Sequence, residues 1–185
     1  IGRSNIVDSY GVGTTMVAQG VLNRATGSGN ATLGNGATDV TAAGIGIGTN
    51  NTVDGAGVAV GSGNLVNNTG SSGFAFGNGN APTAAYSSAF GMGSNASSVS
   101  AIAIGTIATA SGNTAISMGR QTTASGQTSI ALGNVSTASQ TNAIAIGHST
   151  QATAAGAIAL GGGTNGASTN LDATAARATG TNAVA

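Results

Sequence analysis

The chain has 185 residues, no net charge and only 4% charged residues, against about 25% in an average soluble domain. Such a neutral chain is not typical of proteins that bind nucleic acids or anionic membranes. Glycine occurs 33 times and cysteine is absent, which excludes a disulfide-stabilised fold. No apolar run approaches the ~18 residues of a membrane-spanning helix.

Residues 21–93 contain an irregular series of short repeats. Each repeat ends in two larger residues separated by a small one and followed by glycine. The closing motifs include Ile45–Gly48, Val58–Gly61, Phe74–Gly77 and Phe90–Gly93, and the last two would each close a unit of sixteen residues. The segments 62–73 and 78–88 are rich in Asn, Gly and Ser, so we expect insertions at corners of the fold there.

Residues 94–161 form a regular array, in which units of fourteen residues follow one another without a gap from Thr106 to Gly161. The larger residues of the closing motifs are Ile102, Ile104, Ile116, Met118, Ile130, Leu132, Ile144, Ile146, Ile158 and Leu160. The closing glycines are Gly105, Gly119, Gly133, Gly147 and Gly161. A fixed period of this kind is the signature of a repeat architecture.

A unit of fourteen residues is too short for a helical repeat, which needs roughly 33 to 47 residues. The large-small-large pattern predicts a strand whose two larger side chains share one face. Stretches such as Thr123-Ala124-Ser125 predict a second, shorter strand in each unit. Each unit is therefore expected to be one coil of an all-β, parallel β-solenoid, with the larger side chains inside and glycine at a corner that needs positive φ.

After Gly161 the repeat is interrupted. Residues 162–173 are predicted to be an insertion, and residues 174–185 match part of a further repeat. The composition shows no linker, so we expect residues 1–185 to form one β-roll domain. We also expect this domain to be a piece of a longer protein.

The sequence offers no constellation of residues typical of catalysis or metal binding. It contains one histidine, four scattered Asp residues and no Glu. His148 directly follows a closing glycine, so we expect it at an exposed corner. We therefore predict no catalytic residues, no metal, no cofactor and no enzymatic activity.

The stretch Asn142-Ala-Ile-Ala-Ile-Gly147, followed by His148-Ser149-Thr150, resembles the head repeat of YadA-like trimeric autotransporter adhesins. Residues 128–133 and 113–119 are similar. This resemblance implies a single-stranded, left-handed parallel β-roll that assembles as a homotrimer. It further implies an extracellular head on the outer membrane of a Gram-negative bacterium, anchored through regions absent from this sequence.

In such a trimer, we expect the small residues between the larger ones to face the other chains, because small residues let backbones approach closely. These residues are Ala103, Ser117, Ala131, Ala145 and Ala159. The expected function is attachment to host extracellular matrix, cells or abiotic surfaces through many weak contacts. We expect the contacts at the segments 62–73, 78–88 and 162–173, because recognition tends to occur on loops held by a rigid scaffold.

Two alternatives remain open. Thr109, Thr123 and Thr137 occupy the same place in successive units, and a flat row of threonines would suit an ice-binding solenoid, although Gln151 ends the row. A self-assembling, amyloid-like matrix protein is favoured less, because the glycine corners suit discrete coils.

Overall fold

The computed structural model describes residues 6–8, 17–26, 31–41, 44–67, 71–163 and 175–185. The fold is the predicted one, an all-β parallel β-solenoid with repeats of about 14 residues. The chain divides into two compact units, Ile1–Met92 and Gly93–Ala185. A single domain over the whole chain stays a prediction. No helix in the described ranges is long and apolar enough to cross a membrane.

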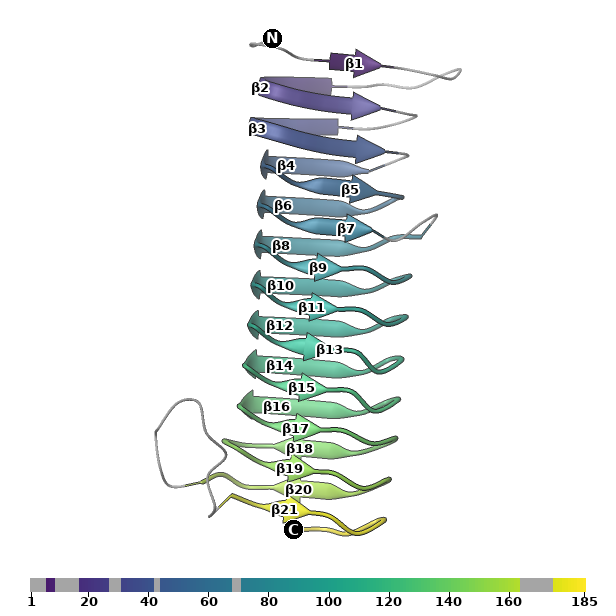
Figure 1. The fold of residues 1–185 in the computed structure, drawn as a ribbon, viewed down its shortest axis with the longest axis vertical. Helices are drawn as coiled ribbons and strands as arrows, with labels where there is room; N and C mark the ends of the chain where they lie inside the picture. The colour runs from purple at the N-terminus through teal and green to yellow at the C-terminus, as the bar shows by residue number, and fades with distance from the viewer. Residues whose placement is uncertain (1–5, 9–16, 27–30, 42–43, 68–70, 164–174) are drawn as a thin grey trace. The chain divides into compact units, whose positions relative to one another are not determined.

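In the first unit, long strands alternate with short ones from β4 to β10 (Figure 1). The strands are β1 (Ile6–Asp8), β2 (Val17–Thr26), β3 (Ala31–Thr41), β4 (Ile45–Thr49), β5 (Thr52–Asp54), β6 (Val58–Ser62), β7 (Leu65–Asn67), β8 (Phe74–Asn78), β9 (Ala81–Pro82) and β10 (Ser88–Met92). Strand β3 pairs with β4 through Ala31–Leu33 and with β5 through Asp39–Thr41, so it follows both walls of the coil.

The second unit has two parallel sheets that form the two walls of each coil. The strands are β11 (Asn95–Ala96), β12 (Ile102–Thr106), β13 (Thr109–Ala110), β14 (Ile116–Arg120), β15 (Thr123–Ala124), β16 (Ile130–Asn134), β17 (Thr137–Ala138), β18 (Ile144–Ile146), β19 (Gln151–Ala152), β20 (Ile158–Leu160) and β21 (Arg177–Ala178). The long wall contains β12, β14, β16, β18 and β20, and the short wall contains the odd-numbered strands. Residues fourteen apart pair directly, as Ile116 does with Ile130 and Gly119 with Gly133.

The repeat frame differs from the prediction near the end of the first unit. Phe90 pairs with Phe76 and Gly91 with Gly77, so the motif that closes this coil is Ser88-Ala89-Phe90-Gly91. We had expected Gly93 to close it. The predicted frame was wrong because Gly-x-Gly offers two candidate corners, and pairing with β8 selects the one that buries Ala89.

The segments predicted as corner insertions largely follow the regular coil. Residues 62–73 contain strand β7, and residues 78–88 contain strand β9. Between β8 and β10 the spacing is fourteen residues, so 78–88 is not an insertion. Residues 68–70 and 164–173 lie outside the described residues.

The interior of each coil is lined by small side chains. Ala103, Ser117, Ala131, Ala145 and Ala159 on the long wall are fully buried, at 0% exposure within a single chain. Ala110, Ala124, Ala138, Ala152 and Ala178 on the short wall are buried opposite them. In the first unit, Val53 and Val66 pack against Ala59 and Ala75.

This arrangement reverses two predictions. The ten larger residues expected inside the coil lie on its outer surface, and the five small residues expected to face other chains lie inside. The reason is that side chains alternate across a strand, so only one of the two sets can point inward. With alanines on both walls the walls pack closely, and an Ile or Leu has no space between them.

Four closing glycines, Gly105, Gly119, Gly133 and Gly147, lie in close contact with the backbone of the next coil. Gly105, Gly119, Gly133, Gly147 and Gly161 have φ between 126° and 133°, a region that residues with a Cβ rarely adopt. A Cβ on Gly119 would also overlap the carbonyl oxygen of Gly133 in the next coil. Glycine therefore fixes the spacing between coils as well as the corner.

A ladder of buried asparagines runs through the first unit. Asn51, Asn64 and Asn80 each stand third after a closing glycine and are at most 1% exposed. The Asn64 side-chain amide donates to Asn51 Oδ1 at 3.0 Å and to the Gly77 carbonyl at 3.0 Å. Asn80 repeats the pattern toward Asn64 and Gly91. The ladder thus gives hydrogen-bond donors to the carbonyl groups of the glycine corners.

Ser129 is a polar residue at an interior position that alanine occupies in the adjacent coils. Its hydroxyl is buried without a hydrogen-bond partner, whereas Ala115 and Ala143 occupy the same place in the adjacent coils. We expect Ser129→Ala to raise the free energy of unfolding by about 1 kcal/mol, because it removes an unsatisfied polar group. Chemical denaturation would measure this, with the exposed Ser125→Ala as a control that changes little. A destabilised Ser129→Ala chain would contradict the prediction.

Candidate interaction surfaces

In the coils whose side chains the structure describes, most outward side chains of the long wall are large and apolar. We call this surface the apolar face. In the second unit it consists of the ten residues Ile102, Ile104, Ile116, Met118, Ile130, Leu132, Ile144, Ile146, Ile158 and Leu160. Met118 is 43% exposed and Leu160 is 51% exposed. None of these residues is charged or polar. A contiguous, partly exposed apolar surface of this kind marks an interaction site.

The first unit carries a similar face with side chains of more varied size, including three phenylalanines. Its outward residues are Ile45, Ile47, Val58, Val60, Phe74, Phe76, Ser88 and Phe90. The rings of Phe76 and Phe90 stack, with centroids 5.2 Å apart and planes 8° apart. These large residues lie outside, not in the interior as the large-small-large pattern predicted. The small residue between each large pair was the available signal that the large side chains face outward.

In the second unit, the outer surface of the short wall is polar. Thr109 pairs with Thr123, and Thr123 pairs with Thr137, so these three residues form the predicted row. The next partner is Gln151, which is 7% exposed, and after it comes Arg177. The hydroxyl row therefore spans three coils before other side chains replace it.

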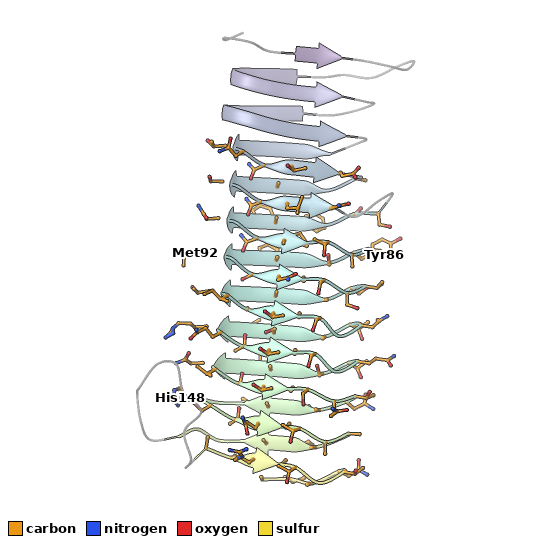
Figure 2. All side chains as sticks on the ribbon, in the orientation of Figure 1. Tyr86, Met92 and His148 are labelled. Atoms are coloured by element: carbon orange, nitrogen blue, oxygen red, sulfur yellow. The ribbon has the colours of Figure 1, made fainter. Side chains whose placement is uncertain are left out.

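The edges of the coils hold the remaining candidate residues. In the first unit, Tyr86 and Met92 project from opposite edges (Figure 2) and are 63% and 54% exposed. In the second unit, Ile107 is 53% exposed and adopts a φ of 57°, which is unusual for a β-branched residue. Arg120 Nη1 donates to Gln121 Oε1 at 2.8 Å at the corner after Gly119.

His148 is less exposed than its position after a closing glycine predicted. Its two ring nitrogens are buried and have no hydrogen-bond partner. The Gly163 amide donates to the His148 carbonyl at 3.1 Å, and Gly162 lies against the His148 backbone. Gly162 and Gly163, which follow the next closing glycine, therefore lie against this corner. The sequence alone did not indicate this contact.

The described residues contain no cluster of three or more metal-ligating side chains and no pocket. The surfaces that the structure presents are flat and extended. They suit contacts with another extended surface.

A family model for the YadA head domain repeat, covering two copies, matches four overlapping windows, residues 96–122, 110–136, 124–150 and 138–164. The windows are offset by fourteen residues, the same step that pairs Ile116 with Ile130 in the structure. No curated protein matches the chain. YadA-like proteins are adhesins, generally non-enzymatic and surface-exposed, that form trimers and bind surfaces. Residues 96–164 of this chain are therefore a YadA-like head domain.

Proposed function

We propose that this chain is the head of a homotrimeric bacterial surface adhesin. The apolar face of each copy packs against the other two copies, and the polar wall and edges contact the host. The observation that carries the proposal is the apolar face itself, because a neutral repeat protein has no other reason to present ten large apolar side chains in a row. Closed symmetric assemblies bury such a surface in every copy.

The energetics favour assembly through this face. Burying one large apolar side chain contributes roughly 1.5–3 kcal/mol, and these side chains are already partly covered, so each contributes a fraction of that value. Summed over the coils of three copies, the contribution exceeds what is needed to offset the lost translational and rotational freedom of ~4–15 kcal/mol. This proposal replaces the small-residue interface that the sequence had led us to expect.

The host-facing partner is proposed as an extracellular matrix protein, a cell surface or an abiotic surface. The flat, polar short wall and the exposed edge residues support weak contacts that are repeated along the coils and multiplied by many copies. The low charge of the chain predicts binding that depends little on salt. The proposed location is the cell surface, at the outer membrane of a Gram-negative bacterium.

The test is the solution mass of the chain, measured by light scattering over a range of concentrations. We expect three times the 17.1 kDa of one chain. Met118→Asp with Leu132→Asp places two charges on adjacent coils of the apolar face, and we expect it to yield folded monomers. Thr123→Asp with Thr137→Asp adds the same charge to the polar wall and should leave the trimer intact.

A monomeric chain would call for a second measurement, made on the chain fused to a trimeric coiled coil. There, the Met118→Asp, Leu132→Asp pair should lower the stability of the fusion far more than the control pair. Equal effects of the two pairs would contradict packing through the apolar face. If the trimer is found, solid-phase binding to matrix proteins at low and moderate salt tests adhesion.

The in-register row Thr109, Thr123 and Thr137 favours ice binding as a second candidate. The row spans three coils, which is short for recognising a crystal surface. Thermal hysteresis that is lost in Thr123→Asp would support this candidate, and its absence in the unmodified chain would dismiss it.

A further inference from the structure

The apolar face of the second unit repeats almost identically from coil to coil. Its outward pairs are Ile-Ile, Ile-Met, Ile-Leu, Ile-Ile and Ile-Leu. If one copy moved along another by one coil, about 4.8 Å, an Ile or Leu would still meet an Ile, Leu or Met. Repetitive faces of this kind specify their register weakly.

The apolar face of the first unit, taken by itself, is not uniform. Phe74 and Phe76 stand on one coil and Ser88 and Phe90 on the next, and Ser88 pairs directly with Phe74. Phe74 is 41% exposed, and the stacked rings of Phe76 and Phe90 support each other. The preceding coil presents the much smaller Val58 and Val60 at the same places. The face therefore carries a raised aromatic group with a notch at Ser88 beside it.

We propose that Phe74, Phe76, Ser88 and Phe90 form a register key that fixes the axial alignment of the three copies. The inference rests on the proposed trimer. In a symmetric trimer, equal heights of the three chains meet, so the aromatic groups pack together and the Ser88 notches coincide. A shift by one coil would set aromatic rings against valines or the notch, leaving both overpacked and empty places.

The absence of cysteine in the chain allows this to be measured directly. Ile47 and Val60 occupy the same place on adjacent coils of the apolar face. Copies with Val60→Cys and differently tagged copies with Ile47→Cys are refolded together and oxidised. Aligned copies form Val60→Cys homodimers, whereas copies displaced by one coil form mixed-tag dimers. In the otherwise unmodified chain we expect at least about a tenfold excess of aligned cross-links over mixed ones.

The decisive variant makes the face uniform by Phe74→Ile, Phe76→Ile, Ser88→Ile and Phe90→Ile. We expect its mass to remain that of a trimer, while mixed-tag cross-links rise to a level comparable with the aligned ones. Met118→Ile with Leu132→Ile changes the second unit instead and should leave the excess of aligned cross-links unchanged. If the fourfold variant does not fold, Phe74→Ile with Ser88→Ile alone gives the same readout.

The outcomes separate the two proposals. A trimer of the fourfold variant that still forms only aligned cross-links overturns the register key and leaves the trimer standing. The proposed function is overturned by two results together. The parent chain is monomeric by itself, and Met118→Asp with Leu132→Asp does not lower the stability of its coiled-coil fusion more than the control pair does. Mixed cross-links that are already abundant in the parent chain also overturn the register key.

Discussion

Replacing Gly119 by alanine is expected to cost about 4 kcal/mol or more of unfolding free energy and to prevent stable folding of the second unit. Two effects add here. The φ of 132° is a conformation that costs an L-residue ~1–3 kcal/mol. The new Cβ would also overlap the carbonyl oxygen of Gly133, which belongs to the backbone of the next coil and cannot move aside alone. Urea unfolding followed by circular dichroism would measure the loss.

Gly63→Asn is the matched control. Gly63 has a φ of 63° at a corner, and no atom lies within 4 Å of the place its Cβ would take. Asn50 stands at the same corner one coil earlier with a φ of 53°. We expect Gly63→Asn to change stability by less than ~0.5 kcal/mol, because Asn tolerates the left-handed region. Both variants must be compared at one protein concentration, since assembly adds to apparent stability. Equal stability of the two would show that contact between coils does not require glycine.

Replacing Asn64 by alanine is expected to cost about 3–5 kcal/mol, because several buried groups lose their partners together. Its Oδ1 accepts from the Asn80 backbone amide at 3.0 Å and from the Asn80 side-chain amide at 3.1 Å. Its own side-chain amide donates to Asn51 Oδ1 at 3.0 Å. Truncation removes the middle rung of the ladder, leaves the Gly77 carbonyl without this donor and opens a cavity.

Asn67→Ala is the control for this change. Asn67 lies three residues away in the same coil, on the exposed surface of β7. We expect its replacement to change stability by less than ~0.5 kcal/mol, as is usual for surface positions. The midpoint and slope of denaturant unfolding distinguish the two variants. A small effect of Asn64→Ala would mean that water replaces the amide, and that the ladder contributes little to the stability of the first unit.

Part of the interaction surface could be read from the sequence, and part could not. The threonine row at Thr109, Thr123 and Thr137 follows from the period alone, because residues at equal places in a solenoid must lie in register. The asparagine ladder was also present in the spacing of Asn51, Asn64 and Asn80 from the preceding glycines. It was missed because a chain rich in asparagine makes any one of them unremarkable, and only their shared burial shows their role.

The sequence by itself determined the period, the strand pattern, the glycine corners and the solenoid fold. These features depend on local alternation and on corners such as that at Gly119, whose positive φ glycine adopts readily and other residues rarely do. Only the tertiary structure decided which side of each strand is inside. Alternation defines two faces of a strand but does not show which one points inward. Large apolar side chains are usually buried, and on that rule Ile130 and Leu132 would lie in the interior. The distance between the two walls, set by Ala124 and Ala131, leaves no space for them there. The large side chains therefore lie on the outer surface, where Met118 and Leu160 are 43% and 51% exposed.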